Sequence, residues 1–94
     1  MLFVLICEDK PDSLELRLAN REKHLAYIGT LGERVRLAGP MLGDDGETMV
    51  GSLFILEAGS ADEIAAINAD DPYTRAGLFG NVTIRPFRQV VPAP

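Results

Sequence analysis

The sequence predicts an α+β fold of the ferredoxin-like type, in which two helices lie on one face of a four-stranded antiparallel sheet. Three observations support this fold class. A continuous apolar run opens the chain, two later segments carry the capping signals of helices, and the other apolar stretches are bounded by turns that contain Gly or Pro. Along the chain these segments follow the order β-α-β-β-α-β.

The first strand is predicted over Leu2–Cys7, an apolar and partly β-branched run that is followed by charged residues. A run without polar alternation is typical of a strand that is buried on both faces, so we expect it in the centre of the sheet. Asp12 and Glu15 have the spacing of an N-cap and its N3 partner. They predict a helix that continues to about Leu31, because Gly32 favours a helix end.

The middle of the chain predicts a hairpin and a second helix. Val35–Ala38 and Met49–Glu57 have extended character, and the Gly and Asp residues at 43–46 between them tolerate the positive φ angles of a turn. Ser60–Glu63 has the sequence of a capping box. We therefore expect a helix from this box to about Ala69.

A short turn and a last strand complete the predicted fold. Asp71 and Pro72 suit the N-cap and the first position of a helical turn, which ends at Gly77. Val82–Arg85 alternates between apolar and polar residues, as a strand does. Pro86 then indicates an edge strand or a bulge, since proline cannot donate to a central ladder.

Composition limits the class of protein. The length of 94 residues fits one domain, which we predict over residues 1–94. Hydrophobic residues make up 47% and charged residues 24%, values that favour a folded chain over a disordered one. The net charge of −5 argues against nucleic-acid binding, which requires basic residues that neutralise phosphates.

Metal sites and membrane segments are not predicted either. Cys7 is the only cysteine, so the chain cannot form an internal disulfide, and one thiol with one histidine provides no zinc ligand set. The N-terminal apolar run is too short to span a bilayer and has no basic segment before it. We expect a cytoplasmic protein without a metal or a cofactor.

The predicted sheet has one face that no helix covers. If the strands contribute apolar residues to both faces, this open face is a large apolar patch. Its burial against a second copy predicts a homodimer.

A helical wheel of the first helix places four apolar residues on the stripe that should pack on the sheet: Leu14, Leu18, Leu25 and Ile28. Arg21 falls inside this stripe, and Arg17 and His24 lie on its flank. Polar groups at the border of a core need partners. Either the two arginines extend along the stripe to water and His24 is a hydrogen-bonded structural histidine, or the three side chains form a site.

Other candidate residues also have plain structural interpretations. A role as a helix cap would be enough to explain Asp71. Cys7 lies at the end of a buried strand, where a thiol is typically inert. Ser52 lacks the Gly-x-Ser-x-Gly motif of a nucleophile, and Tyr73 can pack its ring beside Pro72. The glycines form no phosphate-binding loop, so no dinucleotide is implied.

Four short motifs occur in a fixed order: Arg21-x-x-His24-Leu25-x-Tyr27, Gly39-Pro40, Gly51-Ser52, and Asp71-Pro72-Tyr73 before Ala76-Gly77-Leu78-Phe79. In this combination the sequence resembles the YciI-like family over almost its whole length, from Phe3 to Phe87. The resemblance implies a ferredoxin-like fold and a dimeric α+β barrel, in which the sheets of two copies face each other. It also implies a His/Asp pair in a pocket, here His24 and Asp71, and an association with dehalogenation of chlorinated hydroxyhydroquinones.

The leading hypothesis is therefore a cofactor-free lyase or isomerase in which His24 and Asp71 transfer protons on a small anionic ligand, aromatic or enolic. Arg17 and Arg21 would hold the anion, and Arg21 should point toward the pocket. Ser52 and Tyr73 complete the predicted substrate site. The alternative is a ligand-binding or scaffolding domain without catalysis. A haem or metal monooxygenase on the same barrel type is disfavoured because the chain has one histidine.

Overall fold

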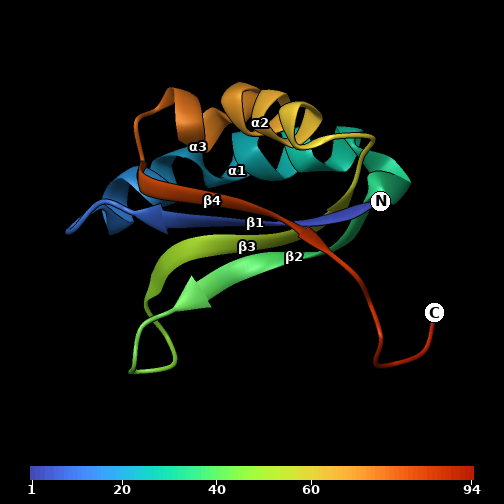
Figure 1. Ribbon diagram of the computed structural model, residues 1–94. Helices are drawn as coiled ribbons and strands as arrows, with labels where there is room; N and C mark the ends of the chain where they lie inside the picture. The colour runs from blue at the N-terminus through green and yellow to red at the C-terminus, as the bar shows by residue number, and fades with distance from the viewer.

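Four strands form one antiparallel sheet in the order β2-β3-β1-β4, and the helices lie together on one of its faces (Figure 1). The computed structural model describes residues 1–94. Its elements are β1 (Leu2–Asp9), α1 (Leu14–Thr30), the 3-10 turn η1 (Gly32–Arg34), β2 (Val35–Leu42), β3 (Met49–Glu57), α2 (Ala61–Asp70), α3 (Pro72–Arg75) and β4 (Phe79–Phe87). The predicted ferredoxin-like α+β fold is confirmed. None of the helices is both long and apolar enough to cross a membrane.

The core lies between the sheet and the helices. β1 is a central strand, as predicted, and pairs with β3 on one side and β4 on the other. Successive side chains of a strand point to opposite faces, so alternate residues of β1 and β3 point toward the helices. The buried core cluster consists of Phe3, Leu5, Cys7, Phe54, Leu56, Ala58 and Ile64.

Local capping signals predicted the second half of the chain well. The side chain of Ser60 accepts a hydrogen bond from the backbone N–H of Glu63, and the carboxylate of Glu63 accepts one from the N–H of Gly59. Asp71 caps α3 by accepting from the backbone N–H of Tyr73. Gly77 follows α3 with a φ of 78°, a conformation that glycine adopts without strain.

Both edge strands are longer than the sequence predicted. β2 continues through Pro40 to Leu42, and β4 continues through Pro86 to Phe87. β2 and β4 are the two outer strands of the sheet. An edge strand leaves one row of its N–H groups outside the ladder, so a proline there removes no required hydrogen bond.

The start of α1 differs from the prediction. Asp12 does not cap this helix; it adopts a φ of 56° in the turn that follows β1. Ser13 occupies the N-cap position, and its hydroxyl donates to the carbonyl of Pro11 instead of accepting a helix N–H. Aspartate is among the few residues that tolerate positive φ, so the same residue type suits a turn as well as a cap.

The predicted packing face of α1 is wrong for three of its four residues; only Ile28 packs against the core cluster. Leu14, Leu18 and Leu25 are 40%, 53% and 50% exposed, whereas Arg17 and His24 are 2% and 8% exposed. The wheel assumes that the most apolar stripe faces the sheet. Here the helix is rotated toward its flank, because the other elements supply hydrogen-bond partners for the two polar side chains.

Candidate active site

A cavity of about 160 Å³ opens between α1, the β2–β3 hairpin and α3. Half of the residues that line it are apolar, and the rest include the polar candidates from the sequence. The lining residues are Arg17, Arg21, His24, Leu25, Ile28, Ala38, Gly39, Pro40, Met49, Ser52, Phe54 and Tyr73. Five of the six predicted site residues therefore border one cavity. The sixth, Asp71, does not line the cavity but contacts the lining residue His24.

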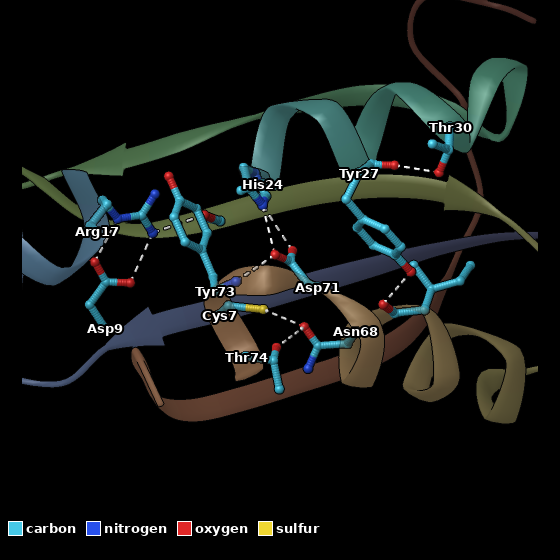
Figure 2. A network of polar contacts seen from close by, with 12 residues as sticks. Cys7, Asp9, Arg17, His24, Tyr27, Thr30, Asn68, Asp71, Tyr73 and Thr74 are labelled. Atoms are coloured by element: carbon cyan, nitrogen blue, oxygen red, sulfur yellow. Dashed lines mark hydrogen bonds and ion pairs between the residues drawn. The ribbon is translucent and has the colours of Figure 1, made fainter. Parts of the chain in front are cut away.

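His24 and Asp71 come from different elements and meet in the interior. Nδ1 of His24 lies 2.8 Å from Oδ1 and 3.0 Å from Oδ2 of Asp71 (Figure 2). An ionised carboxylate only accepts hydrogen bonds, so Nδ1 carries the proton and donates it. In the neutral ring this leaves Nε2 with a lone pair, which can accept a proton from a ligand.

Two aromatic rings hold the imidazole of His24 in place. It stacks on Tyr73 with the ring centroids 4.0 Å apart and the planes inclined by 14°. Phe54 meets it edge-on at 6.0 Å. Asp71 is fixed as well, because the oxygen that faces Nδ1 also accepts from the backbone N–H of Tyr73 at 2.9 Å.

Arg17 lies on the other side of the Tyr73 ring, with its guanidinium carbon 4.6 Å from the ring centroid (Figure 2). Its Nε and Nη2 donate to the two oxygens of Asp9 at 2.7 and 2.8 Å, and Nη2 also donates to Ser52 Oγ at 2.9 Å. Burial by itself lowers the pKa of Arg17, but the hydrogen bonds and charge of Asp9 outweigh it, and the net shift is upward. Arg17 is a permanent cation.

Tyr73 is a neutral hydrogen-bond donor at physiological pH. Burial raises the pKa of its phenol, and the charges of Arg17 and Arg21 oppose this shift without cancelling it. The residue is 1% exposed and borders the cavity. Its ring lies between the guanidinium of Arg17 and the imidazole of His24, so its contacts extend well beyond the neighbouring Pro72.

Arg21 and Ser52 also border the cavity. Arg21 lines it, as expected, but is exposed to solvent, whereas the wheel assigned it no exposed direction. Ser52 is 3% exposed and reaches the cavity from β3. The cavity thus has a charged, accessible rim and a buried polar floor.

Asp9 is the polar residue that the sequence analysis did not identify. Its side chain is 4% exposed, and it belongs to the same row of β1 as Phe3, Leu5 and Cys7, which points toward the helices. A carboxylate at the end of such a row needs a buried cation. Extending the period-two pattern of the strand by one step would have placed Asp9 on the buried face, but it would not have identified Arg17 as its partner.

Cys7 lies beside this site but does not have the properties of a nucleophile. Its Sγ lies 3.5 Å from Oδ1 of Asn68, which also accepts from the hydroxyl of Thr74. Burial, supported by the charge of Asp71, raises the pKa of the Cys7 thiol to about 12. The thiol therefore stays protonated.

The family model of the YCII-related domain matches residues 1–88. Protein YciI from Escherichia coli O6:H1 is 39% identical over 97 residues, which cover 96% of this chain and 99% of the relative. An uncharacterized protein from Haemophilus influenzae is 36% identical with the same coverage.

Among solved structures, 5-chloro-2-hydroxyhydroquinone dehydrochlorinase from Burkholderia phenoliruptrix AC1100, in complex with 2,5-dihydroxybenzoquinone, superposes with a TM-score of 0.88. It is 37% identical, and the match covers 96% of each chain. An antibiotic biosynthesis monooxygenase has a TM-score of 0.58 at 14% identity, with 96% of this chain and 99% of that chain covered. The second likeness extends to the fold alone.

Proposed function

This chain belongs to the YCII-related domain family, and from that premise we propose that it is a small lyase or isomerase that moves protons on a hydroxylated ring or enol. One observation supports the proposal above the others. A buried imidazole, oriented by a carboxylate through Nδ1, borders a cavity that is lined by both apolar and polar groups. This is the arrangement that a general base requires.

The cavity suits a small planar substrate. A cavity of about 150 Å³ holds one benzene-sized ring, and the volume here is about 160 Å³. Leu25, Met49 and Phe54 offer apolar contacts to the faces of such a ring. Ser52, Tyr73 and Arg21 offer donors to its oxygens.

We propose a dehydrohalogenation-like reaction, since the similar dehydrochlorinase is named for 5-chloro-2-hydroxyhydroquinone. Loss of HCl from such a ring converts two hydroxyls into carbonyls. One hydroxyl proton moves to the carbon that bears chlorine, and a second is removed as the C–Cl bond breaks and chloride leaves with the bonding electrons. Nε2 of His24 would accept each hydroxyl proton in turn, deliver the first to carbon and release the second to solvent.

Asp71 would support both transfers without leaving its position. Its carboxylate holds the imidazole through Nδ1, which leaves Nε2 as the free ring nitrogen, and would stabilise the imidazolium that forms after the first transfer. Because Asp71 is also the cap of α3, the position of the base is tied to the fold of that helix.

The first prediction tests this dyad. Purified protein is mixed with hydroxyquinones, lactones and 5-chloro-2-hydroxyhydroquinone, while chloride release and absorbance are followed. We expect turnover of a halogenated hydroxy ring, and we expect His24→Ala to lower kcat by about 10²- to 10⁴-fold, the usual loss of a general base. Asp71→Asn should cost more in activation free energy, seen as a lower kcat, than in the free energy of unfolding, because asparagine still caps a helix.

Circular dichroism of both variants provides the folding control, and Asp44→Asn in the exposed hairpin turn provides a matched change of charge. Full activity of either site variant would rule out the dyad mechanism. Tight binding without turnover of any compound would support the non-catalytic ligand-binding alternative instead.

We also propose that the protein is a homodimer. The helices leave the other face of the sheet uncovered (Figure 1). By the alternation of the strands, this face carries the half-buried Val4, Ile6, Leu53 and Ile55, and Leu37, which pairs with Ile55, is 62% exposed. Burial of an apolar patch of this kind favours association of two copies. The cytoplasmic location stays a prediction, which fractionation of cells would test.

A further inference from the structure

Asp9 forms a buried ion pair with Arg17, which lines the cavity of the proposed site, whereas Asp9 itself does not border that cavity. The two side chains are 4% and 2% exposed, and two parallel hydrogen bonds join them. Asp9 reaches this place from the end of β1, where the pairing with β4 shifts register between Glu8 and Asp9. A buried charge is stable only when it is paired, so each residue fixes the other.

The pair leaves Arg17 few donors for a ligand. Nε and one N–H of Nη2 donate to Asp9, and the other N–H of Nη2 donates to Ser52. Recognition of a carboxylate or phosphate by arginine uses two parallel N–H groups of the fork. That fork already holds Asp9, so only Nη1 remains.

Ser52 accepts a hydrogen bond from Arg17. Its Oγ accepts from Nη2 at 2.9 Å, and no carbonyl or carboxylate of the protein accepts its hydroxyl proton. Ser52 borders the cavity, so this proton is available to a ligand there. The positive charge of Arg17 behind Oγ makes the hydroxyl a stronger donor.

We propose that Asp9 is a positioning residue, which holds Arg17 so that the hydroxyl of Ser52 donates to an oxygen of the substrate. This inference rests on the proposed function of the same site and specifies its ligand. The subsite fits a single oxygen that carries partial or full negative charge, such as a phenolate or an enolate. In this proposal Ser52 binds the anion, and Arg17 does not bind it directly as the sequence analysis expected.

A double-mutant cycle tests the role of Asp9. The probe is 2,5-dihydroxybenzoquinone, a ring with ionisable hydroxyls, and its dissociation constant is measured by absorbance titration for the wild type, Ser52→Ala, Asp9→Asn and the double variant. We expect each single change to weaken binding by about tenfold, the value of one charge-assisted hydrogen bond. The double variant should be no weaker than the single ones, since both changes remove the same contact.

Two results would overturn the proposal. If the two changes act independently, the double variant binds about a hundredfold more weakly, and Asp9 does not act through Ser52. If Arg17 is a direct anion clamp, Asp9→Asn frees its fork and tightens binding. Failure of the wild type to bind the probe would also contradict this subsite.

Three further variants separate positioning from folding. Asp44→Asn removes an equal charge at an exposed turn and should bind as the wild type does. Asp9→Glu keeps the carboxylate and should recover part of the affinity.

If Asp9→Asn does not fold, Asp9→Leu combined with Arg17→Met removes the pair without leaving an unpaired charge, and it should bind as weakly as Ser52→Ala. Wild-type affinity in that variant would refute the proposal. The measurement needs no turnover, so an inactive protein that shows the coupling would contradict the proposed function alone.

Discussion

Asp71 performs two tasks with one carboxylate. It accepts from the backbone N–H of Tyr73 as the cap of α3, and it accepts from Nδ1 of His24. One carboxylate therefore both caps the start of α3 and orients the imidazole of His24. At the scale of the residue, the cap and dyad interpretations of Asp71 are therefore both compatible with its geometry.

Cys7 illustrates how burial controls reactivity. Its thiol has a pKa raised by burial from 9.0 to about 12, so it is protonated at neutral pH. We predict that the folded protein does not react with a thiol reagent such as 5,5′-dithiobis(2-nitrobenzoic acid) at pH 8, and that it reacts fully after denaturation in guanidinium. Rapid reaction of the native protein would show that the thiol is accessible and ionised.

The same shift has a consequence for stability. The unfolded chain loses the thiol proton near pH 9.0 and the folded chain near 12, so the contribution of Cys7 to stability is complete below about pH 9 and is lost as the pH rises toward 12. The stability of the wild type should fall across this range relative to Cys7→Ala. Parallel urea unfolding curves at several pH values measure the difference.

At the scale of the element, α1 does not follow its own amphipathic pattern. Its buried residues are Arg17 and His24, while leucines on its outer side reach solvent. The hydroxyl of Tyr27 donates to the carbonyl of Ile67 and ties α1 to α2. The helix is thus held by polar contacts to its neighbours as well as by apolar packing.

A pair of substitutions tests this orientation of α1. Leu18→Ala removes a side chain that is 53% exposed, and we predict a change of less than about 0.5 kcal/mol in the free energy of unfolding. Ile64→Ala removes a fully buried side chain from α2 and should cost about 2 to 5 kcal/mol. Urea unfolding at equal protein concentrations measures both. A large loss for Leu18→Ala would mean that the leucine stripe faces the core.

At the scale of the whole molecule, the sheet has one covered and one open face. Ile55 on β3 lies opposite Val4 of β1 and Leu37 of β2, in the centre of the open face. We predict that the wild type has twice the chain mass of 10.2 kDa and that Ile55→Asp has the mass of one chain. A buried carboxylate without a partner opposes dimer formation.

Light scattering after gel filtration at micromolar concentration measures these masses. Leu18→Asp is the matched control, because it places the same charge on the helix side of the molecule. It should leave the dimer intact. A monomeric wild type would refute the homodimer, and so would a dimer that persists in Ile55→Asp.

The order of the elements could be predicted from the sequence because its signals are local. The capping box at Ser60, the cap at Asp71 and the acidic turn at 43–46 act within a few residues of themselves. The apolar run of β1 also predicted its central place, which the strand order confirms, although Val4 and Ile6 on the open face of the sheet are only half-buried. Family motifs, in turn, identified His24 and Asp71 as a pair before any distance was known.

The side of α1 that faces the sheet and the partners of Arg17 depend on how distant parts of the chain pack together. Leucines and polar residues alternate on this helix, so its pattern alone favoured the wrong stripe. The outcome depends on Asp9, Ser52 and Asp71, which are 8, 35 and 47 residues away from their partners. A buried polar side chain is stable only where the fold brings it a partner, and that condition depends on long-range geometry that no local pattern contains.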